Sequence, residues 1–496
     1  MKYINKRNIC YILFVVLILI LMCLSFVCFD GNEKIDENDI MASHIIQKDI
    51  VTNIKINGIL GSYDKDNAAF YYSANSFNYK NVKVISPYKV KHYIKKNDDK
   101  HYTIFVYSSK YYYQYDIYLV NIPLVNIYTY DIFDNEKCDI ELNYCSMGIT
   151  ISDYTKNNSN NSYNILNSTG KIRVRGATSR DFEKKSYKIS VEKKVKLFDL
   201  TTDNDWVLDA LYSDPSKIRN KLSSDIWNEI NNNQLVNNDL GVEFVEVFID
   251  NQYKGLYTIK NNVDKHVTSL NDNGLLIKAV NHFNYNYVEM INNRTFNIEE
   301  DGSFLNMKIK EYNSDLFTVF LNRMYNYYSN NMVFDTFDED NYFNYKILIS
   351  LMSGDDNVTK NIYYSINQSN DKILITPWDM DMTWGLVFDP SSSIYSKKMM
   401  YNYNDDLRMQ YDVMFDLTDE SFEKVKRRYW ELRKEVINME TIDSYLDEYQ
   451  ELLINSGAIK RDNDKWYAYD FKLEIDEIRE WVKNRIIYLD AFFTIN

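Results

Sequence analysis

Two carboxylates follow an expected strand at a spacing that suits a metal ion. The segment ILITPWDMDMTWG, residues 373–385, reads as an apolar strand that runs into Asp379 and Asp381. Side chains at positions i and i+2 of a strand point to the same side. Carboxylate oxygens are hard ligands that suit Mg²⁺ or Mn²⁺ ions bridging phosphates. The sequence therefore favours a metal site over the alternative of a capped turn.

A second segment sets a carboxylate and an amide in a spacing used for phosphoryl transfer. SGDDNVTKN, residues 353–361, places Asp356 and Asn361 in D-x4-N spacing between an apolar helix pattern and a strand pattern. In the catalytic loop of protein kinases this Asp orients the acceptor hydroxyl and this Asn binds a metal ion. The string is common by chance, so an Asp/Asn turn is the simpler interpretation of the segment alone.

A basic hairpin supplies the cations that phosphates need. KIRVRGATSRDFEKKSYKIS, residues 171–190, reads as a strand, a turn at glycine and a returning strand. Arg175, Lys184, Lys185 and Lys188 are its candidate nucleotide-binding residues, since guanidinium and ammonium groups both suit phosphate oxygens. The alternative is a hairpin with solvated charges. No GxGxxG loop and no GxxxxGK[ST] loop is present, which argues against an ordinary kinase or P-loop protein.

The elements around these segments predict an α+β fold in several parts. Residues 51–121 contain short alternating runs separated by Asn, Asp and Ser, which indicate a small all-β, sandwich-like domain. Residues 122–496 contain strand patterns and then helix patterns, typical of one α+β domain that carries all three segments. Residues 30–50 are polar and are expected to be a linker.

The N-terminal segment predicts a membrane anchor. Residues 9–29 are 21 residues without a charge, long enough to cross a bilayer as one helix. Basic residues precede them and acidic residues follow, so the bulk of the chain is expected outside the cytoplasm. A cleaved signal peptide is the alternative.

Charge and cysteine content narrow the class of protein. The net charge of −14 argues against nucleic-acid binding, because an acidic chain repels a phosphate backbone. Two cysteines lie beyond the apolar segment, Cys138 and Cys145, and their C-x6-C spacing suits either a disulfide across a short hairpin or two buried thiols. No zinc-ligand spacing is present.

Taken together, the segments resemble the CotH kinase family of atypical, spore-coat-associated kinases. The resemblance runs from about residue 122 to the C-terminus, through RVRGATSRDFEKKSYKI, DWVLDALYSDPSKIRNKL, VEVFIDNQYKGLYTIKNNVD, DDNVTKNIYYS and ITPWDMDMTWG. It implies a protein-kinase-like fold that uses ATP and Mg²⁺ or Mn²⁺ to phosphorylate serines of a coat or surface protein. Asp356 matches the catalytic Asp and Asp379 the metal-binding Asp. Asn361 fits the second metal ligand, and Lys184 or Lys185 fits the phosphate lysine, near Arg175.

Two positions depart from the family pattern and keep other functions open. Ala177 stands where the family usually has Asn, and Asn261 where it usually has Glu. Loss of a carboxylate removes a full charge, so a catalytically weak or inactive protein for surface adhesion or coat assembly is the alternative. A metal-dependent hydrolase using Asp379 and Asp381 is a third hypothesis, disfavoured by the five histidines of the chain, none of which lies in these motifs.

Overall fold

The computed structural model describes most of residues 37–494, and they divide into two compact units. It leaves out 1–36, 49, 131–137, 154–163, 199, 232–238, 283–284, 331, 368–369, 401–403, 405–413, 415–416 and 495–496. The first unit is Met1–Thr129, Met147–Asn167 and Glu246–Gly255, and the second is Tyr130–Ser146, Ser168–Val245 and Leu256–Asn496. The predicted anchor at residues 9–29 lies outside the described residues. Among those that are described, no helix is long and apolar enough to span a bilayer.

Two β-sheets share one core in the first unit. A six-stranded sheet has the order β4-β5-β9-β8-β7, with β1 paired to β9, and a three-stranded sheet has the order β3-β2-β6. Buried side chains from both sheets form one cluster, for example Ile54, Phe70 and Ile104. The strands are β1 Ile45–Ile46, β2 Asn53–Ile56, β3 Ile59–Leu60, β4 Ser62–Asp64, β5 Ala69–Ser73, β6 Val82–Ile85, β7 Lys91–Lys96, β8 His101–Tyr107 and β9 Tyr111–Val120.

The expected linker is structured in its described part. Helix α2, Glu37–Ser43, buries Ile40 completely, and Ile40 packs in a cluster with Phe105, Tyr107 and Tyr112. Strand β1 pairs in parallel with β9. A single apolar residue in a polar stretch is a weak signal, so the sequence did not indicate this helix.

Seven strands form a closed barrel in the order β10-β11-β12-β13-β14-β16-β15. They are β10 Leu124–Tyr130, β11 Cys145–Asp153, β12 Asn164–Arg175, β13 Ser186–Val195, β14 Asp203–Asp209, β15 Val242–Ile249 and β16 Gln252–Asn261. The basic segment forms the antiparallel pair β12–β13, with Arg173 opposite Lys188. Cys138 and Cys145 form a disulfide with a Cα–Cα distance of 5.7 Å, which decides between the two alternatives for these cysteines.

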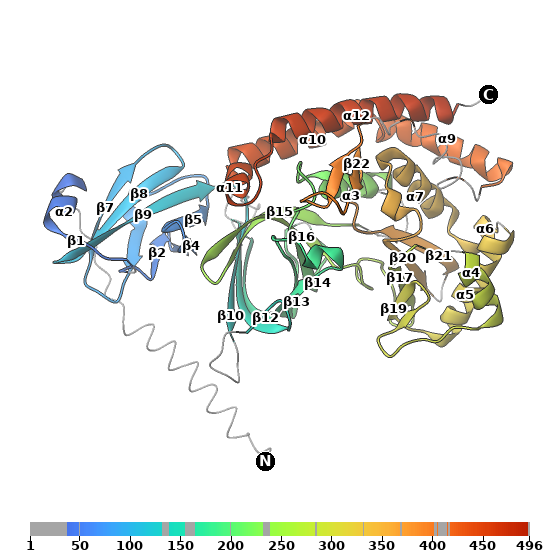
Figure 1. Ribbon diagram of the computed structural model, residues 1–496, viewed down its shortest axis with the longest axis horizontal. Coiled ribbons are helices and arrows are strands. Elements are labelled where there is room, and N and C mark those ends of the chain that lie inside the picture. Colours follow the sequence, from blue (N-terminus) through green and yellow to red (C-terminus); the bar gives the residue numbers. More distant parts are fainter. Residues whose placement is uncertain are drawn as a thin grey trace, which may run out of the picture. The chain divides into compact units, whose positions relative to one another are not determined.

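A five-stranded sheet and a layer of helices lie in the second unit (Figure 1). The sheet order is β18-β19-β17-β20-β21, and β22 pairs with β23. These strands are β17 Leu275–Ala279, β18 Ser303–Phe304, β19 Met307–Glu311, β20 Ile362–Asn367, β21 Asn370–Pro377, β22 Leu386–Phe388 and β23 Ser396–Lys398. The helices are α3 Arg219–Asn231, α4 Tyr285–Asn293, α5 Ser314–Asn330, α6 Val333–Thr336, α7 Glu339–Met352, α9 Asp419–Glu435, α10 Met439–Asn455, α11 Ala458–Lys465 and α12 Phe471–Phe492. The prediction of a mixed α+β fold is confirmed.

Helix α7 is the central helix of this layer. It begins after Asp338, whose side chain accepts a hydrogen bond from Asn341 N, and ends at Ser353 in the left-handed region with φ 51°. It contacts α3, α9, α12 and β21, so almost all of its residues are buried. This packing fixes the position of the D-x4-N loop that follows. Helix α12 likewise buries one apolar face, which consists of Ile475, Ile478, Trp481, Val482 and Ile486.

Candidate functional site

A cleft of about 620 Å³ in the second unit collects most of the predicted site residues. Strands β12, β13, β17 and β19 contribute to its lining, together with the segments that follow β14, α7 and β21. The predicted residues in the lining are Asp356, Asn361, Asp379, Asp381, Arg175 and Lys188. The acidic segments and the basic hairpin therefore face one another across a single cavity.

Negative charge accumulates directly after β21. Asp379 has φ 58°, in the left-handed region, and its side chain is 41% exposed. Ser213 Oγ donates a hydrogen bond of 3.1 Å to Asp381 Oδ2. Burial raises the pKa of Asp381 well above its ordinary value, and the negative charges of Asp379 and Asp209 raise it further. A divalent cation near these carboxylates would relieve that repulsion.

The ligands in the cleft fit a hard cation that also binds phosphate. Within the described part of the chain, no third His, Cys or carboxylate forms a tight cluster with Asp379 and Asp381. An ion held there would complete its coordination with the Asn361 amide oxygen, water or phosphate oxygens. Mg²⁺ is commonly bound in this way, by one or two carboxylates plus substrate. The residues present therefore fit Mg²⁺ or Mn²⁺.

Backbone hydrogen bonds join the D-x4-N loop to the Asp379 segment. Trp378 N donates to Asn361 O at 2.9 Å, and Asn361 N donates to Ala279 O at 3.1 Å. The Asn357 side chain donates to Trp378 O at 2.8 Å. Asn361 is thereby held beside the residue that precedes Asp379, as a shared metal site requires.

Asp356, in the turn Asp355–Asn357 of this loop, has two basic partners. Lys360 Nζ is 2.8 Å from Asp356 Oδ2, and His282 Nε2 is 3.8 Å from Asp356 Oδ1. The other ring nitrogen of His282 is 3.1 Å from Thr359 Oγ1. The Asp356 side chain is 29% exposed, so an acceptor hydroxyl can reach its carboxylate.

Cations line the wall that faces these acids. The Arg175 guanidinium lies over the Trp378 ring at 5.6 Å, and Lys188 Nζ is 3.0 Å from Asp205 Oδ2. Lys278, on β17, lies 5.4 Å from the Tyr363 ring centroid. Burial lowers the pKa of Lys278 to about 8, against the opposing charge of Asp379.

The sequence interpretation missed Lys278, Lys260 and Asp209. Lys260 Nζ lies 2.6 Å from Asp209 Oδ2 and 3.9 Å from Asp379 Oδ1. Burial alone would raise the pKa of Asp209, but Lys260 and Arg175 outweigh this effect and hold it below its ordinary value. Lys278 is the single charge in LLIKA, and Lys260 and Asp209 each follow a stretch of uncharged residues, as in GLYTIK and WVLDA. A charge inside a buried strand was the signal that could have found them.

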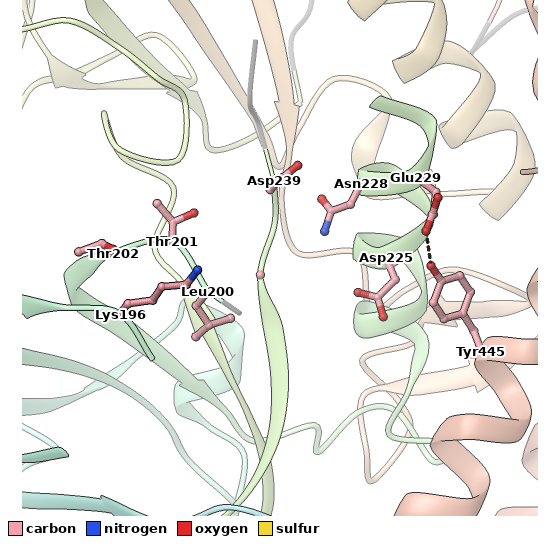
Figure 2. A pocket seen from close by; sticks show the side chains of 10 residues that line it. Lys196, Leu200, Thr201, Thr202, Asp225, Asn228, Glu229, Asp239 and Tyr445 are labelled. Atoms are coloured by element: carbon pink, nitrogen blue, oxygen red, sulfur yellow. Dashed lines mark hydrogen bonds between the residues drawn. The ribbon is translucent and has the colours of Figure 1, made fainter. Parts of the chain in front are cut away.

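A separate pocket of about 700 Å³ has acidic walls (Figure 2). Asp225, Asn228 and Glu229 lie on α3, and Tyr445 on α10 donates a hydrogen bond of 2.9 Å to Glu229. None of the predicted site residues lines this pocket. Lys196 is the one basic side chain among the residues that line this pocket, whereas the cleft gathers Arg173, Arg175, Lys188, Lys278 and Lys310, so the cleft suits phosphates better.

Comparison with known proteins agrees with this arrangement of residues. The family model described as CotH kinase protein matches residues 172–489, which include the basic hairpin and both acidic segments. The chain belongs to the CotH kinase protein family. It is also 26% identical over 350 residues to the inner spore coat protein H of Bacillus subtilis (strain 168), covering 65% of this chain and 87% of the relative.

Two cations that the CotH resemblance had suggested for phosphate binding do not line the cleft. Lys184 is 1% exposed, and its Nζ donates to Asp462 Oδ1 at 2.7 Å and to Leu256 O at 2.5 Å. Lys185 Nζ donates to Arg180 O at 2.7 Å. Lys184 is therefore part of a buried ion pair, because its side chain points into the protein rather than toward the cavity.

The two departures from the CotH pattern have different structural consequences. The Asn261 amide donates to Thr201 O at 3.1 Å and accepts from Thr201 N at 3.0 Å, and the residue is 3% exposed. It does not line the cleft, so its neutral side chain removes no ligand from the cavity. Ala177 does line the cleft and begins the turn Thr178–Arg180 without a side-chain cap.

Replacing Lys184 should distinguish a structural cation from a catalytic one. In Lys184→Met, the buried Asp462 carboxylate would keep the hydrogen bond from Leu256 N at 2.9 Å and one of its two cations, Lys217, at 3.7 Å. We expect the free energy of unfolding to fall by about 3 kcal/mol, since removing one partner leaves a buried charge uncompensated. The matched Lys185→Met change should lower the free energy of unfolding by less than about 0.5 kcal/mol. Urea unfolding of both variants measures the difference, and equal stabilities would contradict the structural role of Lys184.

Proposed function

We propose that this chain is a phosphotransferase that moves the terminal phosphoryl group of ATP to a serine hydroxyl of a coat or surface protein. The observation that carries the proposal is the convergence of Asp356, Asn361 and Asp379 in one cleft, opposite Arg175 and other cations. Phosphoryl transfer needs this combination of positioned oxygen ligands and positive charge more than it needs covalent chemistry.

Each side of the cleft has its own role in this proposal. Asp356 orients the acceptor hydroxyl and receives its proton as the oxygen attacks phosphorus. Asp379, with Asn361 and Asp381, would hold Mg²⁺ or Mn²⁺, which neutralises charge on the transferring phosphate when bound. Arg175 and Lys278, with Lys188 and Lys310, orient the phosphates through charge-assisted hydrogen bonds.

The decisive experiment measures nucleotide binding and phosphate transfer by the full chain. Isothermal titration with ATP in Mg²⁺ or Mn²⁺ should show one site, and labelled phosphate from the terminal position should appear on serine of the chain or of an added coat protein. Absence of ATP binding with either metal would reject the proposal. Binding without transfer would favour the second candidate function.

The second candidate is a non-catalytic role in coat or surface assembly. The relative found in Bacillus subtilis is named as an inner spore coat protein, and Ala177 leaves the turn in the cleft uncapped. A surface location fits either function. Single-pass anchoring through residues 9–29 stays a prediction from the sequence, tested by alkaline extraction of membranes.

Lys278 should give ATP affinity a pH dependence. Its pKa of about 8 means that the ammonium is charged near neutral pH and is lost as the pH rises above that value. We expect the affinity for ATP to fall about 10-fold between about pH 7 and about pH 9 in the wild-type protein. Lys278→Met should bind weakly at both pH values. Lys265→Met, which removes a lysine paired with Asp272 outside the cleft, should keep the wild-type profile.

Lys278→Met should be more stable than the wild type, which separates a loss of ATP binding from a loss of folding. Unfolded lysine has its ordinary pKa of 10.5, so the folded chain binds fewer protons than the unfolded chain between about 8 and 10.5. The charged side chain therefore costs stability below about pH 8, and Lys278→Met should recover on the order of 2 kcal/mol there. A variant that loses both affinity and stability would contradict this account.

A further inference from the structure

Three potential metal ligands meet outside the cleft. Asp203 begins β14, and Asp264 and His266 follow the end of β16. One ligand atom from each of the three lies within 4.8 Å of the others. None of them lines the cleft, so the phosphotransfer proposal makes no use of this cluster.

Asp203 is the residue that makes the cluster unusual. It is 1% exposed, and its Oδ1 accepts hydrogen bonds from Asn204 N at 2.7 Å and Asp205 N at 3.4 Å. Its Oδ2 is buried and has no hydrogen-bond partner. A buried carboxylate oxygen without a donor is costly, and the nearby negative charge of Asp264 adds to that cost. A cation at this oxygen would remove both penalties.

The other two ligands are held in place by their own loop. Asp264 Oδ1 accepts from His266 N at 2.7 Å and from Val267 N at 3.3 Å. Thr268 Oγ1 donates to Asp264 O at 2.7 Å. These bonds fix the loop without consuming every oxygen of the Asp264 carboxylate. The loop is therefore organised before any ion arrives.

A cation already approaches the imidazole in this structure. Lys194 Nζ lies 2.5 Å from His266 Nε2. Lys194 is exposed, so its side chain can swing into solvent at little cost. The ammonium therefore occupies one imidazole nitrogen, and a metal ion at that nitrogen would compete with it.

We propose that Asp203, Asp264 and His266 bind one divalent transition-metal ion of the Zn²⁺ or Mn²⁺ type. Two carboxylates and one imidazole suit these ions, whereas Mg²⁺ and Ca²⁺ prefer oxygen ligands alone. The ion ties the start of β14 to the segment after β16. These two strands carry Asp209 and Lys260, which pair at 2.6 Å beside the cleft. The ion therefore has a structural role, since it holds β14 and the segment after β16 together. This role does not depend on phosphotransfer.

The experiment is equilibrium binding of Zn²⁺ to the full chain in excess Mg²⁺, which occupies any hard-cation site in the cleft. Wild-type protein and Asp379→Asn should bind one Zn²⁺ with equal affinity. His266→Gln should lose at least about 100-fold in affinity, because removing a direct ligand costs more than removing a partner of a ligand. Co²⁺ as a spectroscopic substitute should show a ligand-field spectrum that His266→Gln abolishes.

A second variant guards against a folding artefact. Lys194→Met removes only the competing ammonium from an exposed position, so the protein should bind Zn²⁺ about 10-fold more tightly than the wild type. Unchanged Zn²⁺ affinity in His266→Gln overturns the proposal. So does weaker Zn²⁺ binding in Lys194→Met, or a Zn²⁺ site that disappears in Asp379→Asn.

Discussion

Asp379→Asn should lower the rate of phosphate transfer by about 10³-fold without unfolding the protein. The carboxylate faces the cleft beside Asp381, and the substitution removes one full charge from the candidate metal site. Asparagine is the right replacement because position 379 has φ 58°, a conformation that asparagine adopts more readily than most residues. Alanine would add backbone strain and confuse the two effects.

The measurements are the rate of labelled phosphate transfer and the affinity for Mn²⁺ in the presence of ATP. Both should fall together in Asp379→Asn, while the urea unfolding midpoint should stay close to that of the wild type. Asp272→Asn is the matched control, because it removes a 92%-exposed carboxylate that pairs with Lys265 away from the cleft. Wild-type transfer by Asp379→Asn would rule out the proposed metal ligand.

Sequence reasoning located the acids of the cleft because their spacing is local. The D-x4-N string and the paired aspartates each lie within a few residues, so each is visible as a local pattern. The expected strand does not extend to the pair, because β21 ends at Pro377 and Asp379 has φ 58°. The hydrogen bonds that join the two segments could not be predicted. The backbone bond from Trp378 N to Asn361 O depends on the register of β20 and β21 rather than on residue type, and the bond from the Asn357 side chain to Trp378 O depends on tertiary packing.

Sequence reasoning was less successful with the cations, for a physical reason. A dense run of lysines and arginines is visible in the sequence, but the direction of each side chain is not. Lys184 pairs with Asp462, which is 278 residues away, and no local pattern reports such a contact. Lys278 is inconspicuous in the sequence because it is a single charge within an apolar strand. The partner that makes a cation structural or functional is set by tertiary packing.

The folded part of the first unit begins earlier than the composition indicates, because contacts far apart in the sequence decide which residues fold. Residues 37–46 look like linker, yet one buried isoleucine and one short parallel pairing connect them to the first unit. Alternation in residues 51–121 indicated strands correctly: β2 and β4 bury alternate residues, although β5 is buried along its whole length. Periodicity therefore predicted element types better than it predicted where an element ends.

Asp356→Asn should reduce transfer by about 10³-fold while leaving ATP affinity within about 3-fold of the wild type. In the proposed mechanism Asp356 contacts the acceptor hydroxyl and not the phosphates, so its loss should affect the chemical step alone. Lys360 Nζ, 2.8 Å from the carboxylate, can still contact the asparagine oxygen, which should preserve the loop.

The matched control is Asp355→Asn, an exposed neighbour in the same turn that does not line the cleft. The two variants are compared by single-turnover transfer and by ATP titration. Equal losses in both would show that the turn was disturbed, whereas a loss confined to position 356 would assign the proton acceptor to this carboxylate.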